Sequence, residues 1–192
     1  MLLNLELWVR ILLAVAIAFA ISFAATPVVK AFATKMGAID VPDGKRRVHD
    51  HPIPRMGGLA IFLGFLLSVV LFSDITRQVR GILLGSVMIV ACGAIDDVVN
   101  LRAWIKLLVQ IAAAVIAVAH DVVIEFFSNP NIFSDNELLF LGWLAIPVTV
   151  LWIVGITNSV NLIDGLDGLA VGVSTIASTT MFVVVEPLSI PA

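Results

Sequence analysis

Charged residues are scarce in this sequence, and their scarcity excludes several classes of protein. Only 13% of the 192 residues are charged and 60% are hydrophobic, and the mean hydropathy is +1.11. An average soluble domain carries about 25% charged residues, so this chain has too little polar surface to cover a soluble globule of its size. Disordered, collagen-like and coiled-coil chains are excluded too, because apolar residues dominate in long runs. An integral membrane protein is the class that remains.

The sequence also has only one cysteine, a small net charge and no internal repeat. The one cysteine, Cys92, has no second cysteine among these residues with which to form an intrachain disulfide. The formal net charge of −3 is too small to favour nucleic acid as a partner. No repeat or low-complexity linker divides the sequence, so we expect residues 1–192 to form a single transmembrane domain.

Long apolar runs are what the sequence has instead. A helix needs about 20 residues to cross the hydrocarbon core, and most of the runs are shorter, so their helices are expected to continue into the polar flanks. The third helix is then expected to reach Asn100, which puts Asp96 and Asp97 near the lipid headgroups. The pattern predicts an all-α integral membrane protein with about six transmembrane helices. The six runs are Leu7–Val29, Gly57–Phe72, Gly81–Ile95, Ala103–Ala119, Leu138–Ile156 and Leu169–Val185.

The basic residues fall mostly on one side of the predicted membrane. Eight of the eleven Lys and Arg residues lie between the first and second runs or around the start of the fourth. By the positive-inside rule we expect segments 30–56, 96–106 and 157–168 to be cytoplasmic and the N-terminus to lie outside. The acidic segment 120–137 then lies outside, and a turn signal at Asn129 predicts a short hairpin or an interfacial helix there. Every dense polar cluster falls on the cytoplasmic face.

The first polar cluster runs from Asp40 to Gly58, and segment 38–56 is predicted to be an irregular loop because it is rich in proline, glycine and charge. An ordinary cytoplasmic loop explains its lysines and arginines, but it explains neither its two histidines nor the pair Gly57-Gly58 that follows. Glycines at a helix start allow backbone N–H groups to approach an anion, and the helix dipole favours negative charge there. A phosphorylated ligand and an ordinary loop are equally good interpretations of this cluster alone.

The second polar cluster begins with the adjacent carboxylates Asp96 and Asp97. Neighbouring carboxylates repel each other and are costly near lipid, so an ordinary helix end that reaches water explains one acid better than two. A pair suits a hard divalent cation, or one ionised base beside a metal ligand. Lys106 and Gln110, four residues apart, share a helical face close by. These residues favour a functional site.

The third polar cluster follows the fifth run. Asn158, Asn161 and Asp164 recur every third residue, so a helical turn stacks them on one side. Close helix packing through Gly168 and Gly172 explains the glycines here, but it does not explain the asparagines and aspartates. Amide and carboxylate groups can bind a nucleobase, a sugar hydroxyl or a metal-bound water. The spacing does not fit an EF-hand.

In this order, the three clusters resemble the motifs of the polyprenyl-phosphate N-acetylhexosamine-1-phosphate transferases (glycosyltransferase family 4). The resemblance covers about residues 26–172. It rests on a Pro-x-Pro-Arg-Met-Gly-Gly stretch that ends at Gly58, an Asp-Asp pair followed by Lys-Leu-x2-Gln, and an Asn-x2-Asn-x2-Asp-Gly-Leu-Asp-Gly-Leu-Ala stretch. That family includes the enzymes that begin wall teichoic acid and O-antigen synthesis and the lipid I synthase of peptidoglycan.

The resemblance implies a reaction, a location and partners. The phosphate of undecaprenyl phosphate attacks the β-phosphorus of a UDP-N-acetylhexosamine, which gives a lipid-linked pyrophosphoryl sugar and releases UMP. Magnesium, or manganese in its place, neutralises the pyrophosphate. The implied protein is a multi-pass protein of the bacterial plasma membrane, surrounded by membrane lipid, with its active face in the cytoplasm and a homodimer as its assembly. Phosphoryl transfer needs a metal, positioning and charge stabilisation more than covalent protein chemistry.

Matching the family's motifs position by position implies roles for individual residues. Asp96 and Asp97 match an aspartate pair that acts as base for the lipid phosphate or lies close to the metal, and Lys106 matches the lysine that follows the pair. Metal contact is implied for Asp96, Asp97 and Asp164. Asp167 is the implied uracil contact. The substrate-binding candidates are Asn161, Asp164, Gly165, Leu166 and Asp167, together with weaker phosphate-binding candidates at Arg46, Arg47, His49, Arg55, Gly57 and Gly58.

The residues before Gly57 favour one branch of the family. Pro54-Arg55-Met56 resembles the teichoic-acid and O-antigen initiators more than the lipid I synthase, which usually carries Thr-Pro-Thr-Met there. The favoured donor is therefore UDP-N-acetylglucosamine. Phospho-N-acetylmuramoyl-pentapeptide transfer, which makes lipid I, is the alternative within the family.

Two motifs of the family are missing from these residues. One is a Gly-Asp-x-Gly stretch, whose aspartate is the implied main magnesium ligand, and the other is a cytoplasmic His-rich motif. We therefore expect the sequence to be the N-terminal part of a longer catalytic domain, which by itself binds Mg²⁺ poorly and turns over little. A transporter and a non-catalytic fragment are the alternatives from other classes. A transporter is disfavoured, because it predicts acids near the membrane midplane.

Overall fold

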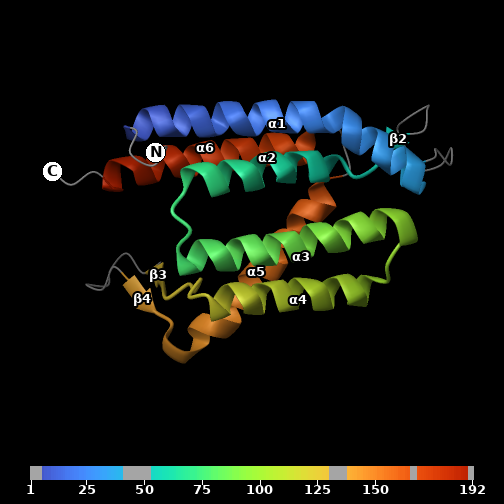
Figure 1. Ribbon diagram of the computed structural model, residues 1–192. Helices are drawn as coiled ribbons and strands as arrows, with labels where there is room; N and C mark the ends of the chain where they lie inside the picture. The colour runs from blue at the N-terminus through green and yellow to red at the C-terminus, as the bar shows by residue number, and fades with distance from the viewer. Residues whose placement is uncertain (1–5, 41–52, 130–137, 165–167, 190–192) are drawn as a thin grey trace.

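The computed structural model describes residues 6–40, 53–129, 138–164 and 168–189. Within these ranges the chain forms six α-helices, one 3-10 turn and two small antiparallel sheets (Figure 1). The helices are α1 (Leu7–Met36), α2 (Gly57–Phe72), α3 (Arg77–Val99), α4 (Ala103–Ala119), α5 (Ala145–Ile163) and α6 (Leu169–Ser189), with the 3-10 turn η2 at Gly142–Leu144. The strands are β1 (Ile39–Asp40), β2 (Ile53–Pro54), β3 (Phe126–Ser128) and β4 (Leu138–Phe140).

The helices follow the apolar runs, and α1, α3, α5 and α6 extend into their polar flanks, as expected; for α2 and α4 the expected extension is wrong. α2 and α4 coincide with their runs, and α3 ends with a left-handed C-cap at Asn100 (φ 51°). α1 continues to Met36 and ends at Gly37, whose φ of 75° is typical of a glycine C-cap. The backbone hydrogen bonds of a helix need no apolar side chains, so α1 and α3 continue past their apolar runs until a left-handed residue turns the chain.

The predicted helix from Leu138 is wrong. Leu138–Phe140 is strand β4, which pairs with β3, and α5 begins only at Ala145. A short apolar run fits a strand and a helix equally well, and here the run pairs with an equally apolar partner. The hairpin predicted around Asn129 is thus confirmed in its two strands; residues 130–137 between them lie outside the described residues.

The irregular loop predicted for residues 38–56 is wrong at both of its ends. β1 and β2 pair antiparallel, with Ile39 opposite Pro54 and Asp40 opposite Ile53. The Arg55 N–H also donates to the Ala38 carbonyl at 2.8 Å. This short ladder closes the segment and brings the start of α2 against the end of α1.

Three helical segments are long and apolar enough to cross a membrane, namely Leu7–Met36, Arg77–Val99 and Gly142–Ile163. Shorter apolar helices accompany them at Gly57–Phe72, Ala103–Ala119 and Leu169–Val184. Large apolar side chains remain uncovered on most of these helices. A helical, membrane-embedded protein is therefore supported, while the total of six spans and their direction stay predictions.

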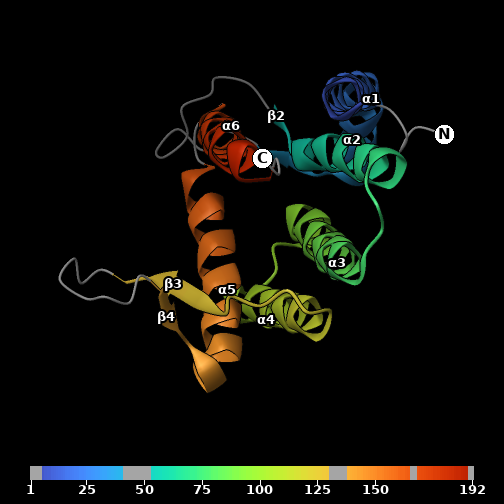
Figure 2. The same cartoon turned by 90° about the vertical axis from the view of Figure 1, so that its left-hand side faces the viewer.

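α1 to α4 each run antiparallel to the next helix, and α5 crosses obliquely from the end of the bundle with β4 to the start of α6, so the connections between the helices gather at two ends (Figure 1). We name the end where α1, α3 and α5 finish and α2, α4 and α6 begin the pocket end. The β3–β4 hairpin lies at the opposite end. Seen along the helices, α1 pairs with α2 and α3 pairs with α4, while α5 passes beside α4 and leads up to α6 (Figure 2). The described parts of the three polar clusters therefore share one end of the bundle.

Small residues allow α1 and α2 to approach each other closely. Gly64 of α2 lies against Ala18 and Ser22 of α1, and Ser68 Oγ donates to the Ala14 carbonyl at 2.8 Å. Helices in lipid associate through such close packing and interhelical hydrogen bonds. The buried face of α2 consists of residues four apart: Ala60, Gly64, Ser68 and Phe72.

Replacing Gly64 with alanine is expected to lower the thermal midpoint of the protein. A Cβ at this position meets the backbone carbonyl of Ala18, so α1 must move, and we expect a loss of about 1–3 kcal/mol. The measurement is thermal unfolding of the detergent-solubilised protein by circular dichroism. Gly155→Ala is the matched control, because nothing described lies within 4 Å of its Cβ and alanine favours a helix interior. Equal midpoints for the two variants would contradict the close α1–α2 packing.

Candidate functional site

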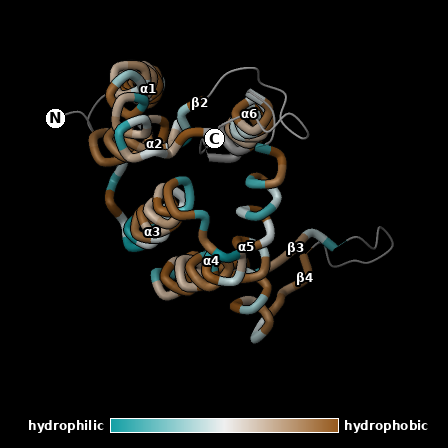
Figure 3. Tube along the Cα trace, turned by 90° about the vertical axis from the view of Figure 1, so that its right-hand side faces the viewer, coloured by the Kyte–Doolittle hydropathy of each residue, from teal (hydrophilic) through white to brown (hydrophobic). Residues whose placement is uncertain are grey.

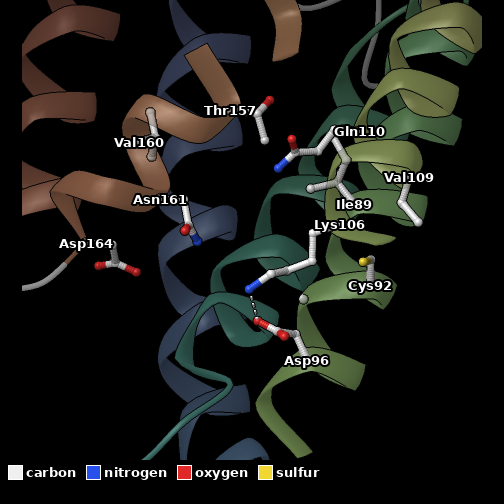
Figure 4. A pocket seen from close by; sticks show the side chains of 11 residues that line it. Ile89, Cys92, Asp96, Lys106, Val109, Gln110, Thr157, Val160, Asn161 and Asp164 are labelled. Atoms are coloured by element: carbon white, nitrogen blue, oxygen red, sulfur yellow. Dashed lines mark hydrogen bonds and ion pairs between the residues drawn. The ribbon is translucent and has the colours of Figure 1, made fainter. Parts of the chain in front are cut away.

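A pocket of about 280 Å³ lies between α3, α4 and α5 (Figure 4). Each helix contributes residues three or four apart, which is the spacing of one helical face. On α3 the lining residues extend from Ile89, within the apolar part of the helix, to Asp96 near its C-terminus. The cavity therefore becomes more polar toward the end of the bundle that we named the pocket end. The lining residues are Ile89, Cys92, Gly93 and Asp96 of α3, Lys106, Val109 and Gln110 of α4, and Thr157, Val160, Asn161 and Asp164 from α5 and its C-cap.

The Asp96 carboxylate contacts both α4 and the turn between α3 and α4. Its Oδ2 lies 2.9 Å from Lys106 Nζ, and its Oδ1 accepts a hydrogen bond from the Leu101 backbone N–H at 2.7 Å. The side chains of Lys106 and Asp96 are 37% and 26% exposed, so the pair is better shielded from water than an ordinary surface ion pair. Asp96 thus braces the α3–α4 turn and directs the Lys106 ammonium group within the pocket (Figure 4).

Asp97 has a different neighbour from Asp96. Its Oδ2 accepts a hydrogen bond from the backbone N–H of Met56 at 3.1 Å, and Met56 directly precedes α2. Asp96 and Asp164 are near enough to repel the Asp97 charge, and Arg55 is near enough to attract it. The three candidate carboxylates therefore share one electrostatic neighbourhood, although each of the adjacent aspartates contacts a different part of the fold.

The third polar cluster lies on one side of the end of α5, as the spacing predicts. Asn161 and Asp164 line the pocket. Asn158 Nδ2 donates to Gln110 Oε1 at 2.7 Å and so joins α5 to α4. Three further candidates of this cluster lie outside the described residues: Gly165, Leu166 and Asp167.

Glycines at the pocket end face open space. A Cβ at Gly57 or Gly58 meets no described atom within 4 Å, and both residues are exposed at the start of α2. The first backbone N–H groups of a helix have no partner one helical turn back; the Leu59 N–H donates to the Met56 carbonyl at 2.9 Å, and those of Gly57 and Gly58 are the candidates to bind an anion. A Cβ at Gly168 or Gly172 also meets no described atom within 4 Å, so the described residues offer no close helix packing that would explain these glycines.

The basic loop is described only at its ends. Arg55 lies beside the candidate carboxylates, where its charge acts on Asp97. Figure 3 looks onto the pocket end and shows hydrophilic segments on α3, α4 and α5 among otherwise hydrophobic helices. Three phosphate-binding candidates lie outside the described residues: Arg46, Arg47 and His49.

Sequence reasoning missed Met56, Cys92 and Thr157 as neighbours of the site. Cys92 precedes Asp96 by one helical turn, and Thr157 precedes Asn161 by one turn, and all four line the pocket. Helical periodicity counted back from the polar candidates can find both. Met56 carries no such signal, since 41 positions separate it from Asp97.

The donor atoms suit magnesium, but the described residues do not enclose it. Carboxylate oxygens are the ligands that magnesium prefers, usually one or two of them together with substrate phosphates. In the part of the chain that the structure describes, no three His, Cys, Asp or Glu side chains group as a metal site. Lys106 and Leu101 already engage both oxygens of Asp96. Asp97 and Asp164 are the described carboxylates that fit such a partial site.

The segment that supplies the pocket also matches a known family model. Residues 79–189 match the model described as glycosyl transferase family 4, and this range contains all of the pocket lining. The chain belongs to glycosyl transferase family 4. The membership agrees with the resemblance that the three sequence motifs carry.

Several curated relatives of the family are similar to the chain. A probable undecaprenyl-phosphate N-acetylglucosaminyl 1-phosphate transferase of Bacillus subtilis is 45% identical over 180 residues, which are 93% of this chain and 49% of the relative. A decaprenyl-phosphate N-acetylglucosaminephosphotransferase of Mycobacterium tuberculosis is 35% identical over 82% of this chain and 41% of its own length. A phospho-N-acetylmuramoyl-pentapeptide-transferase of Anaplasma marginale is 36% identical over 72% of this chain and 43% of its own length.

These matches cover most of this chain but only part of each relative. The chain spans about half the length, or less, of the curated relatives it matches. The comparison with solved structures finds no match. Family membership is therefore shown, and the activity of the whole protein is a proposal.

Proposed function

We propose that the protein transfers N-acetylglucosamine 1-phosphate from UDP-N-acetylglucosamine to undecaprenyl phosphate, as the first membrane step of a cell-envelope glycopolymer. One observation carries the proposal: carboxylate, ammonium and amide side chains surround a single pocket at one end of a bundle of apolar helices. At such an end a lipid phosphate can reach polar groups while its chain stays in the membrane. The family and the names of the relatives supply the reaction class.

In the proposed reaction, a phosphate oxygen of undecaprenyl phosphate attacks the β-phosphorus of the UDP-sugar. The new P–O bond joins the lipid phosphate to the sugar phosphate. The bond between the β-phosphorus and the oxygen that bridges to the α-phosphorus breaks, and its electron pair leaves on that oxygen, so UMP is released. Such a transfer depends chiefly on positioning and on offsetting the charge of the phosphate oxygens.

The residues of the site divide these tasks. The Lys106 ammonium group is directed by Asp96 at 2.9 Å and is the cation that we assign to the phosphate oxygens. Asp97 is the candidate base, or a group close to the metal, and its Oδ2 is held by a backbone N–H. Asn161 and Asp164 offer amide and carboxylate groups that can bind the nucleoside or sugar of the donor.

Asp97 and Asp164 are the described residues that we assign to a magnesium ion, whose charge would offset that of the pyrophosphate. A chelator is the direct test. We expect EDTA to abolish transfer, excess Mg²⁺ to restore it and Mn²⁺ to substitute for Mg²⁺. Unchanged transfer in excess chelator would remove the metal from the proposal.

The proposal includes the bacterial plasma membrane as the location, with the pocket end toward the cytoplasm. The support is the distribution of charge, since eight of the eleven Lys and Arg residues belong to the segments at that end. A homodimer, which the family resemblance implies, is also part of the proposal. Mass measurement of the protein in lipid nanodiscs tests the dimer, and cysteine accessibility in intact cells tests the orientation.

The reaction is tested with membranes that contain the full-length protein, undecaprenyl phosphate and radiolabelled UDP-N-acetylglucosamine. We expect the label to move into the lipid fraction and UMP to be released in equal amount. UDP-N-acetylmuramoyl-pentapeptide replaces the donor in a parallel reaction, because one similar relative bears the name of that activity. Transfer from the muramoyl donor alone would replace the proposal by lipid I synthesis. Transfer from neither donor would favour the transporter or the non-catalytic fragment.

Cys92 offers a reporter of pocket occupancy. It is the one cysteine of the 192 residues and it lines the pocket. We expect UDP-N-acetylglucosamine to slow the modification of Cys92 by a small, membrane-permeant methanethiosulfonate severalfold, because a bound ligand blocks access to the thiol. The matched control is the double variant Cys92→Ser/Ala91→Cys, since Ala91 is exposed on α3 and does not line the pocket. Equal protection at both positions would mean that the donor binds elsewhere.

A further inference from the structure

Met56 has an unusual backbone conformation for its residue type. Its φ of 71° and ψ of 12° lie in the left-handed region, which residues other than glycine adopt uncommonly and at an energetic cost. Glycine occupies the next two positions of the sequence, but not this one. Strain of this kind persists where the surrounding structure over-determines it and is concentrated at functional sites.

The Met56 side chain supplies the constraint. It is only 8% exposed and belongs to a buried apolar cluster at the pocket end. The backbone before it is fixed as well, because β1 pairs with β2 and the Arg55 N–H donates to the Ala38 carbonyl. The cluster joins three helices, with Val29 and Ala33 from α1, Ala60 from α2, and Ala94 and Val98 of α3 packed against it.

The consequence of this conformation is the direction of one backbone N–H group. The Met56 N–H points to Asp97 of α3 and donates to its Oδ2 at 3.1 Å. Asp97 is attracted by Arg55 and repelled by Asp96 and Asp164, and the Met56 N–H is the hydrogen-bond donor that fixes the position of its Oδ2 among these charges. This hydrogen bond joins the residue before α2 to α3, beside the packing of Ala94 and Val98 against the Met56 cluster.

We propose that Met56 is a positioning residue, whose buried side chain locks the left-handed backbone that holds the Asp97 carboxylate in place beside the pocket. The inference rests on the proposed function, since it concerns the same carboxylate. It requires an apolar residue at position 56 that is large enough to fill the cluster and unbranched at Cβ, because β-branched residues strongly resist the left-handed region.

The test compares Met56→Ile with Met56→Leu in the full-length protein. Both replacements are apolar and of similar volume, and only isoleucine is branched at Cβ. For Met56→Ile we expect kcat to fall about 10- to 100-fold, the scale of a misplaced catalytic group, while KM for both substrates changes less than about threefold. For Met56→Leu we expect both parameters to stay within about threefold of the wild-type values.

Combining Met56→Ile with Asp97→Asn distinguishes a positioning role of Met56 from general destabilisation of the protein. In an Asp97→Asn background, the additional loss caused by Met56→Ile is expected to be less than about threefold, because the positioned charge is already gone. Equal kcat values for the isoleucine and leucine variants, or a full isoleucine effect in the Asp97→Asn background, would overturn the inference. Should Met56→Ile fail to fold, a backbone ester at position 56 removes the N–H and keeps the side chain, with a weaker acceptor at the Arg55 carbonyl, and we expect the same loss of kcat from it.

A second readout does not depend on transfer. We expect carbodiimide to label Asp97 severalfold faster in Met56→Ile than in Met56→Leu, because a carboxylate released from its donor is more accessible. Peptide mass spectrometry measures the labelling. Equal labelling rates refute the positioning role even if the protein transfers no sugar phosphate, whereas faster labelling without transfer refutes the proposed function and leaves the positioning of Asp97 intact.

Discussion

Replacing Asp97 with asparagine in the full-length protein is expected to lower sugar-phosphate transfer about 1,000-fold, as the loss of a base or a charge at the reacting centre does. Asparagine has nearly the same size, and its side-chain oxygen can still accept the Met56 N–H that lies 3.1 Å from Oδ2. The substitution therefore removes the negative charge while the contact between α2 and α3 stays in place. Transfer of radiolabel at saturating substrate concentrations measures the loss.

Asp121→Asn is the matched control for Asp97→Asn. Asp121 lies at the opposite end of the bundle, where its Oδ2 is 3.2 Å from Arg77 and its side chain is 57% exposed. The same chemical change there is expected to leave transfer within about twofold, because an exposed ion pair contributes little. Full activity of Asp97→Asn would contradict the assigned role and make Asp164 the next candidate.

Replacing Lys106 with methionine is expected to lower kcat about 100-fold. Methionine keeps the unbranched apolar stem and removes the ammonium group that lies 2.9 Å from Asp96 Oδ2. The phosphate oxygens then lack a neighbouring positive charge. The loss of one preorganised donor at a reacting centre commonly lowers kcat by about 10²–10³. Asp96 also loses its ion-pair partner, so we expect a loss of stability of about 1 kcal/mol.

The double variant Asp96→Asn/Lys106→Met separates these two effects. It removes the uncompensated carboxylate together with the ammonium group, and asparagine can still accept the Leu101 N–H that now donates to Oδ1. We expect the thermal midpoint to recover while kcat stays low. Recovery of kcat as well would reduce Lys106 to a counter-ion for Asp96, with no part in offsetting the charge of the phosphates.

Much of the helical fold could be predicted because the apolar runs dominate the sequence. α2 and α4 begin and end where their runs do, since hydrophobic length alone determines a helix in an apolar surrounding. The strand Leu138–Phe140 could not be predicted in the same way. Its three apolar residues carry no period that separates strand from helix, and the structure decides by pairing them with Phe126–Ser128.

The candidate site could be predicted where its residues repeat along one helix. Asn161 and Asp164 on α5, and Lys106 and Gln110 on α4, share a face because their spacing matches the helical turn. The partners across helices could not be found in this way. Nothing in the spacing indicates that Asn158 bonds to Gln110, 48 positions away, or that Met56 bonds to Asp97.

The sequence by itself determined that this is a helical membrane protein, that its polar clusters gather at one end, and to which family its motifs belong. Scarce charge and long apolar runs suffice for the first two conclusions, because the bilayer requires nothing more of a spanning helix. Only the tertiary structure separated the adjacent aspartates, assigning Asp96 to Lys106 and the α3–α4 turn and Asp97 to the start of α2. The reason is that helix packing, which depends on small residues such as Gly64 meeting another helix, decides which side chains far apart in the chain come within hydrogen-bonding distance.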